Sequence, residues 1–520
     1  MNKNILFIMV DQLRYGYLSC EGHPSISTPN LDKLAKKGVR FSNAHVQSPV
    51  CGPSRMSFYT GRYVSTHGST WNNVPLCVSE KTLGEYMTDL GVRPLLVGKS
   101  HHTPDINGIN RLKFELNDQK INFLKNGGFD VFERDDGIHP DKKVSKDYKY
   151  NRYLLDKGFT DFNPWQSYAN SVIDENNNIH SGWFLRNIKK PARIPAEHSE
   201  TAYMTSRAIE CIKSQKKPWM VHLSYIKPHW PYVAPSPYHS IYNKNDIIPA
   251  IKHKAELENP HPVYNAYLNR EESVNFKTEK VRETVIPTYM GMVKHLDDEI
   301  GRVLDYLESS NLTNNTLIVF TSDHGDYLGD HWLGDKELFH KQSTQIPLII
   351  FDPSPKADFT RGKEIKEFVS AIDIIPTFIE WLNGDIPEEV LEGESLLPLL
   401  HNKKTTKQQY ILTELDYSFR KQREDLNIKP HQARAFAIRN FDWLYIYYVG
   451  FRSQLFDLKN DPNEFYDLGD DIGYKNVINE LKNQLLKCII NTKRRTTIKD
   501  EEIIKRTESW LDLGIYAGKW

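Results

Sequence analysis

Four short apolar runs in the sequence have the pattern of buried strands, and they lie at residues 5–10, 94–97, 219–225 and 317–320. Each run is followed within a few residues by a charged or imidazole side chain: Asp11, Lys99, His229 and Asp323. Apolar runs without alternation are typical of parallel strands that are covered on both faces. Ligands of open α/β sheets bind outside the carboxyl ends of the strands. We therefore expect these four side chains to share one site.

Helical patterns alternate with these runs along the chain. Thr28 reads as the cap of a helix that Gly38 ends. A longer helix is expected near residues 285–309, where apolar side chains recur at helical spacing. A strand at residues 348–351 and a helix at about residues 372–382 follow. This alternation predicts an α/β fold with a large, mixed but mostly parallel sheet between helices.

The chain changes character after about residue 403. Residues 432–471 alternate apolar and polar side chains between turn signals, which is typical of an antiparallel sheet. A helix is expected at residues 475–491. We therefore predict three parts: a catalytic domain of residues 1–403, a smaller C-terminal α+β subdomain of residues 404–491 and a tail of residues 492–520.

Charge and hydropathy exclude several classes of protein. Lys and Arg together number 67, as do Asp and Glu, so the formal net charge is zero, and broad attraction of nucleic acid or an acidic membrane is not expected. No stretch approaches the roughly 18 apolar residues of a membrane span, and the first apolar run is too short for a signal peptide. The five cysteines are scattered, as is typical of reduced thiols. These features predict a soluble cytoplasmic protein.

Cys51 stands directly before a predicted helix, in the stretch SPVCGPSRMSFYTGRY of residues 48–63. The amino end of a helix presents free N–H groups that favour anions. A thiol there is a candidate nucleophile, with a histidine as its base. A structural cysteine buried at a strand-to-helix turn gives the same local pattern. The residues alone leave both interpretations open.

The order CGPSR at residues 51–55, followed by Thr-Gly at residues 60–61, resembles the signature of the type I sulfatases of the alkaline phosphatase superfamily. The resemblance covers roughly residues 3–470, including TSDHGDYLGDHWLGDK from residue 321. Within this superfamily the chain is especially similar to phosphonate monoester hydrolases and bacterial sulfatases. The resemblance implies an alkaline-phosphatase-like fold. It also implies that a formylglycine-generating or anaerobic sulfatase-maturating enzyme converts Cys51 into formylglycine.

A divalent metal ion is the second implied cofactor. Hydrolysis of a sulfate ester places negative charge on oxygens that such a cation can neutralise. By resemblance its ligands are Asp11, Gln12, Asp323, His324 and the modified Cys51. Oxygen ligands favour Ca²⁺, and the imidazole leaves Mn²⁺ or Zn²⁺ as alternatives. Many sulfatases have Asp in place of Gln12 and Asn in place of His324, and the combination in this chain is nearer to the phosphonate hydrolases.

The resemblance also implies catalytic roles for five cationic or imidazole side chains. Arg55 would anchor the hydrated aldehyde, and Lys99 would bind the sulfate group. His229, helped by Lys336, would protonate the departing alcohol. His101 would then take a proton from the hydrate, so that sulfate is expelled as the aldehyde reforms. Phosphonate hydrolases tend to carry Tyr and Thr in place of Lys99 and His101, and this departure favours sulfate esters.

These residues are compatible with three functions. The leading one is hydrolysis of a sulfate monoester, with a sulfated sugar as the first choice of substrate. The second is hydrolysis of a phosphonate monoester or phosphodiester at the same site, because both kinds of substrate carry one negative charge. The third is an inactive homologue that binds small molecules and never has Cys51 modified.

Residues 100–200 are rich in Asn, Asp, Gly, Tyr and Lys and are expected to form long loops around a pocket. Their aromatic side chains either stack on a sugar or aryl group or belong to the core; they are Tyr148, Tyr150, Tyr153, Trp165, Tyr168 and Trp183. Lys341 competes with Lys336 for its role but fits the spacing less well. The tail at residues 505–520 suggests a contact in a homo-oligomer.

Overall fold

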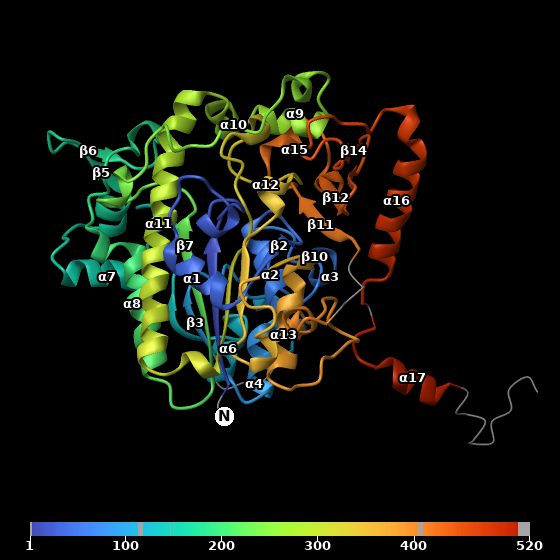
Figure 1. Ribbon diagram of the computed structural model, residues 1–520, viewed down its shortest axis with the longest axis horizontal. Coiled ribbons are helices and arrows are strands. Elements are labelled where there is room, and N and C mark those ends of the chain that lie inside the picture. Colours follow the sequence, from blue (N-terminus) through green and yellow to red (C-terminus); the bar gives the residue numbers. More distant parts are fainter. Residues whose placement is uncertain (1–2, 113–117, 146, 404–408, 494, 508–520) are drawn as a thin grey trace, which may run out of the picture.

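The computed structural model describes residues 3–112, 118–145, 147–403, 409–493 and 495–507. Its centre is an eight-stranded sheet, β10-β2-β9-β8-β1-β7-β3-β4, with helices on both faces. A separate four-stranded sheet, β11-β12-β13-β14, follows toward the C-terminus (Figure 1). The predicted fold class, a large mixed sheet between helices with a smaller antiparallel sheet after it, is confirmed.

The four apolar runs of the sequence are adjacent parallel strands in the middle of the large sheet. They are β8 (Thr316–Ser322), β1 (Asn4–Asp11), β7 (Trp219–Pro228) and β3 (Arg93–Gly98), in that spatial order. Every residue of β1 is buried. Val10 pairs with Tyr225 on one side and Ser322 on the other, and Gly98 pairs with Ser224. The carboxyl ends of these strands therefore lie at one level.

The other half of the sheet makes it mixed. The strand β9 (Leu348–Phe351) runs antiparallel to both β8 and β2 (Val39–His45), whereas β10 (Glu364–Ser370) is parallel to β2. At the opposite edge, β4 (Asp130–Arg134) pairs in parallel with β3. The expectation of long loops throughout residues 100–200 was therefore wrong in part, because a half-exposed edge strand lacks a continuous apolar run.

Side chains of β1 alternate between two cores, one on each face of the sheet. Leu6, Ile8 and Val10 pack in a cluster with residues of α1 (Pro29–Lys37), α8 (Glu200–Lys213) and α11 (Glu279–Ser309). Ile5, Phe7 and Met9 pack in a second cluster with residues of α2 (Cys51–Thr60), α4 (Leu83–Asp89) and α13 (Ile374–Trp381). The two groups of helices cover opposite faces of the sheet (Figure 1).

The remaining regular elements are short and lie mostly in connections. The helices among them are α3 (Val64–His67), α5 (Ile106–Leu112), α6 (Asp118–Lys125), α7 (Lys149–Asp156), α9 (Pro262–Leu268), α10 (Glu271–Phe276), α12 (Lys341–Thr344), α14 (Leu397–Leu400), α15 (Lys421–Asp425) and α17 (Asp500–Arg506). Two further strands, β5 (Ser171–Ile173) and β6 (Ile179–Ser181), form a hairpin.

The small sheet consists of β11 (Ile411–Asp416), β12 (Arg434–Arg439), β13 (Trp443–Tyr448) and β14 (Gln454–Asp457), all antiparallel. Its outer face packs against α16 (Lys475–Ile490), and its inner face packs against Val50 and Tyr327 of the large domain. The three predicted parts of the chain stay a prediction, and residues 508–520 of the tail lie outside the described residues. Among the described helices, none combines the length and the apolar character that a membrane crossing requires.

Candidate active site

The structure brings Cys51 to the carboxyl ends of the central strands. Cys51 is the first residue of α2 and is 1% exposed. Its Sγ lies 3.0 Å from His324 Nε2, 3.1 Å from Lys336 Nζ and 3.6 Å from Asp11 Oδ1. The side chains of His101 and His229 also interact with the sulfur. Side chains that lie as far apart in the sequence as Asp11 and Lys336 therefore converge on one atom.

The surroundings of Cys51 stabilise a negative charge on its sulfur. Burial alone would raise the pKa of the thiol, but Lys336, Lys99 and His324 together lower it well below its ordinary value. Cys211 is also buried, but there Arg93 and Arg207 do not offset the effect of burial, and the pKa of this thiol is raised to about 12. Since both sulfurs are out of water, the difference comes from the cations around Cys51.

The residues that follow Cys51 fix the start of α2. The backbone N–H of Gly52 donates to Asn72 Oδ1 at 2.7 Å, and a Cβ on this glycine would stand 3.0 Å from Asn72 Cα. Ser54 Oγ donates to the carbonyl oxygen of Asp323 at 2.6 Å. Gly61 ends the helix at a φ of 66°. Residues of the CGPSR stretch therefore hold the start of α2 against the segment that follows β8 and against Asn72.

Arg55 joins the carboxylates of the site. Its side chain is fully buried, with Nε 2.7 Å from Asp323 Oδ2 and Nη2 3.3 Å from Asp11 Oδ2. Its Nη1 donates to the carbonyl oxygen of Lys99 at 2.9 Å and to Ser224 Oγ at 2.8 Å. The ion pairs of the guanidinium join it to two predicted metal ligands, Asp11 and Asp323, rather than to the sulfur, so its predicted role as anchor of the hydrate stays a prediction.

Four of the predicted metal ligands have the arrangement that a divalent cation needs. Donor atoms of Asp11, Cys51, Asp323 and His324 all lie within 4.8 Å of one another and are buried. His324 Nδ1 pairs with the carbonyl oxygen of Gly325 at 2.9 Å, which leaves Nε2 to face the cluster. Burial lowers the pKa of His324, but Asp323 and Cys51 outweigh it and raise the pKa to about 9. The donor set thus attracts positive charge.

Gln12 occupies the fifth predicted ligand position, with a φ of 63°. Its Oε1 accepts a hydrogen bond from Lys336 Nζ at 3.0 Å, and its Nε2 donates to Asp326 Oδ2 at 2.7 Å and Asp335 Oδ1 at 3.0 Å. An aspartate at this position would place a third carboxylate against two others. The neutral amide is therefore the side chain that this network requires.

The two lysines approach the site from different elements. Lys99 follows β3 directly and forms an ion pair with Asp11 Oδ2. Lys336 is 4% exposed, and its pKa lies above the ordinary value, because Cys51 and Asp335 outweigh the lowering by burial. Lys341 instead reaches the C-terminal part of the chain, where its Nζ donates to the carbonyl oxygen of Pro462 at 2.7 Å. Of Lys336 and Lys341, which the sequence offered for the same role, Lys336 is the one that contacts Cys51.

Both predicted catalytic histidines keep a ring nitrogen available. His229 Nδ1 pairs with the carbonyl oxygen of Trp230 at 2.6 Å, so Nε2 is left for the site. Burial, with Lys336 next, lowers the pKa of His229. His101 is held by its backbone N–H, which donates to Asp136 Oδ1 at 2.8 Å. Its Nδ1 is buried and has no partner among the described residues.

The sequence analysis did not predict the residues that support the catalytic and ligand side chains. The hydrogen bonds given above show four residues that orient the site: Asn72, Asp136, Asp326 and Asp335. For Asp326 and Asp335, the acidic residues that follow position 322 were the one signal in the sequence. His222 is buried but does not belong to the site. Its ring stacks on Phe7 at a centroid distance of 4.6 Å, which places it in the core.

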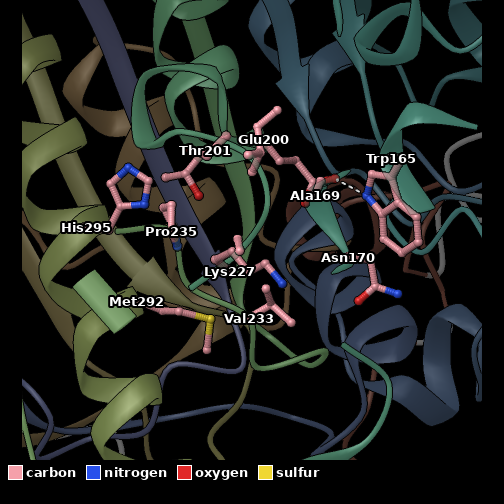
Figure 2. A pocket seen from close by; sticks show the side chains of 13 residues that line it. Trp165, Ala169, Asn170, Glu200, Thr201, Lys227, Val233, Pro235, Met292 and His295 are labelled. Carbon is pink, nitrogen blue, oxygen red and sulfur yellow. Dashed lines mark hydrogen bonds between the residues drawn. The ribbon is translucent and has the colours of Figure 1, made fainter. Parts of the chain in front are cut away.

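A small cavity lies beside Lys227, near the carboxyl end of β7. Figure 2 shows Lys227, Glu200 and Asn170 around it, with Trp165 Nε1 donating to Glu200 Oε1 at 3.2 Å. Its volume is about 30 Å³, which is enough for one or two water molecules. Both polar side-chain atoms of Asn170 lack a described partner there, as expected for groups that bind water.

The fold and the site together define a hydrolase of the alkaline phosphatase superfamily. The profile of the sulfatase family matches residues 3–384, and that of the N-sulphoglucosamine sulphohydrolase C-terminal family matches residues 329–491. The chain therefore belongs to the sulfatase family. The prediction of a type I sulfatase is confirmed at the level of this family.

Individual relatives span nearly the whole chain. The multifunctional alkaline phosphatase superfamily protein PehA of Trinickia caryophylli is 30% identical over 95% of this chain and 96% of its own length. An arylsulfatase of Clostridium perfringens is 27% identical over 94% of each. The crystal structure of a phosphonate monoester hydrolase of Agrobacterium radiobacter superposes with a TM-score of 0.82 at 25% identity, covering 95% of this chain and 97% of the other.

Proposed function

We propose that this protein hydrolyses sulfate monoesters at the Cys51 site, with formylglycine formed from Cys51 and a divalent cation as its cofactors. The observation that carries the proposal is the cluster around the Cys51 sulfur, where Lys336 Nζ is 3.1 Å away and Lys99 is joined to Asp11. Two lysines at one buried nucleophile position favour an anionic substrate.

The two cofactors fit the residues that are present. Hydrated formylglycine supplies a hydroxyl nucleophile and a second hydroxyl whose deprotonation releases the bound sulfate. Asp11, Asp323, His324, position 51 and Gln12 would hold a divalent cation, which would supply positive charge to offset the negative charge that develops in the reaction. Ca²⁺ is the first choice, with Mn²⁺ and Zn²⁺ as alternatives, because one imidazole joins the oxygen ligands.

The side chains of the site divide the remaining work. Lys99 and Lys336 neutralise the sulfate oxygens, since both ammonium groups face the nucleophile position. His229, whose Nδ1 pairs with Trp230 and whose ring also interacts with position 51, transfers a proton to the oxygen of the departing alcohol together with Lys336. His101 has a free, buried Nδ1, and it accepts the proton of the second hydroxyl.

Hydrolysis of a phosphonate monoester or phosphodiester is the second candidate. It is supported by the similarity to the phosphonate monoester hydrolase and by the pair Gln12 and His324, which the sequence placed nearer to that group. Lys99 and His101 favour sulfate, because they add a fixed positive charge and a base. A non-catalytic binding protein is the third candidate.

The test begins with mass spectrometry of the peptide that carries Cys51, from protein produced with a maturating enzyme. Conversion to formylglycine lowers the peptide mass by about 18 Da relative to the thiol. The matured protein is then assayed with 4-nitrophenyl sulfate and a 4-nitrophenyl phosphonate monoester. We expect kcat/KM to be higher for the sulfate. The opposite ranking selects the second candidate, and a matured protein that turns over neither selects the third.

Removal of the metal is expected to abolish turnover. Matured protein should hold about one divalent ion per chain, and Asp323→Asn should hold far less, because one of two buried carboxylate ligands is lost. Elemental analysis after dialysis measures both, and return of activity with Ca²⁺, Mn²⁺ or Zn²⁺ identifies the ion. The exposed Asp161 offers a control in Asp161→Asn. Full activity of metal-free protein would contradict the proposed cofactor.

Several expectations stay predictions. They are the maturating enzyme as a partner, the homo-oligomer and the cytoplasmic location. None of the five cysteines, all of which lie in the described part of the chain, forms a disulfide in the structure, and their reduced state stays a prediction as well.

A further inference from the structure

The loop that carries Lys336 has a backbone conformation that residues with a side chain rarely adopt. Between β8 and α12, six residues other than glycine have φ angles from 50° to 83°: Leu328, His331, Trp332, Asp335, Glu337 and Leu338. Such left-handed residues are unfavourable and persist only where their surroundings hold them. Because two of the six flank Lys336, its place beside position 51 depends on the groups that hold Asp335 and Glu337.

Two arginines hold the residue that follows Lys336. Glu337 is fully buried, and its Oε1 lies 3.3 Å from Arg270 Nη1 and 2.7 Å from Arg420 Nε. The Nη2 atom of Arg420 pairs with the same oxygen, and the other oxygen accepts a hydrogen bond from the hydroxyl of Tyr267 at 2.5 Å. A buried carboxylate that loses a cation is strongly destabilised. The position of Glu337 is therefore fixed by the two guanidinium groups together.

The residue that precedes Lys336 is held from the large domain. Arg270 Nη2 lies 3.3 Å from Asp335 Oδ2, while Asp335 Oδ1 accepts hydrogen bonds from Trp230 Nε1 at 3.2 Å and from Gln12 Nε2 at 3.0 Å. Arg270 thus joins the residues on both sides of Lys336. It leaves Glu337 as the point at which a second part of the chain reaches the loop.

Arg420 reaches Glu337 from the C-terminal part of the chain. It lies between β11 and β12 of the small sheet, directly before α15. Its guanidinium lies over the ring of Trp71, 5.1 Å from the ring centre, which orients the fork of N–H groups toward Glu337. Trp71 precedes Asn72, whose side chain binds the start of α2. Arg420 is therefore anchored on the segment that supports the nucleophile position.

We propose that Arg420 is a positioning residue through which the small sheet completes the active site. Held on Trp71, it fixes Glu337 and thereby keeps Lys336 directed at position 51. This inference rests on the proposed function and extends the site to a part of the chain that the mechanism does not otherwise use. Arg420 acts through Glu337 rather than on the ester itself.

The test compares Arg420→Met and Lys336→Met, alone and together, in the matured enzyme. The substrate is the better one of 4-nitrophenyl sulfate and the 4-nitrophenyl phosphonate monoester. Arg420→Met is expected to lower kcat/KM about 30-fold, because Lys336 is present but no longer held. When Lys336 is already methionine, Arg420→Met should lower kcat/KM by no more than about twofold, since the residue that it positions is gone.

Two further variants examine the ion pair itself. Arg420→Lys keeps the positive charge beside Glu337 and should stay within about fivefold of the unsubstituted enzyme. Glu337→Gln removes the other partner, and in the presence and absence of Lys336 it should repeat the pattern of Arg420→Met. It also decides the question if Arg420→Met does not fold. Lys421→Met is the matched control, because Lys421 is the next cation along the chain, is 75% exposed and pairs with Asp425.

Thermal denaturation separates a positioning role from a general loss of structure. A positioning role predicts the fall in kcat/KM at a melting temperature within about 5 °C of that of the unsubstituted enzyme. Unchanged kcat/KM in Arg420→Met, or an equal loss with and without Lys336, overturns the inference and leaves the proposed function standing. A matured, unsubstituted enzyme that turns over neither ester overturns the proposed function, and this inference with it.

Discussion

Replacement of Cys51 by alanine is expected to lower kcat/KM for a sulfate monoester by about 10⁵-fold, the scale seen when a nucleophile is removed. The substitution removes the atom on which His324, Lys336 and Asp11 converge, whereas Arg55 still holds both carboxylates. The free energy of unfolding should change little, because Lys99 and Arg55 keep their ion pairs with Asp11 and Asp323. Steady-state kinetics and thermal denaturation measure the two effects.

Cys51→Ser gives a sharper version of this experiment. A serine hydroxyl can accept the sulfuryl group but has no second hydroxyl with which to expel it. Produced without a maturating enzyme, this variant should release one alcohol per site and then stop, with its peptide gaining the mass of SO₃. Cys77→Ala is the matched control, since Cys77 is exposed and its sulfur pairs with Ser79 Oγ. Sustained turnover by Cys51→Ala would contradict the proposed nucleophile.

The strand ends could be predicted from the sequence because central parallel strands leave a strong signal. Residues buried on both faces are mostly apolar, so a charged or imidazole residue within a few positions of the end of each run marks the carboxyl edge. Asp11, Lys99, His229 and Asp323 were located in this way, and the structure places them at the carboxyl ends of four adjacent strands. No long-range information was needed beyond the rule that parallel strands end together.

The edges of the sheet could not be predicted in this way. The strands β2, β4 and β10 contain half-exposed residues, and their short polar-apolar patterns do not differ from those of loops. Their pairing depends on which strand lies next to them, which is a property of the whole fold. The antiparallel direction of β9 was likewise invisible, because a buried run of four apolar residues carries no direction.

Within the site, the sequence pointed to candidate residues but not to the contacts that those residues make. Lys336 and Lys341 are both lysines near the same turn, and only the fold directs one to Cys51 and the other to Pro462. The network that surrounds Gln12 depends on Asp326 and Asp335, whose loop returns to the end of β1 over more than 300 residues. Charge neutrality at position 12 is therefore a consequence of tertiary structure.

His229→Ala is expected to show an effect that depends on the leaving group. For a saccharide sulfate, whose alcohol is a poor leaving group, loss of the proton donor should lower kcat by about 10³-fold. For 4-nitrophenyl sulfate the phenolate departs without a proton, so the loss should be about tenfold or less. The exposed His431 provides the control His431→Ala. Rates for a series of substituted phenyl sulfates measure this dependence directly.

The double variant His229→Ala/Lys336→Met tests whether both residues protonate the oxygen of the departing alcohol. If they act on the same oxygen, the combined loss on a saccharide sulfate should be much smaller than the product of the single losses. Lys336 also faces Cys51 and Gln12, so its own substitution should lower rates for every leaving group. A uniform loss across the phenyl series in His229→Ala would instead show that this imidazole positions the nucleophile. In that case Lys336, whose pKa is raised by Cys51 and Asp335 against the effect of burial, would be the proton donor.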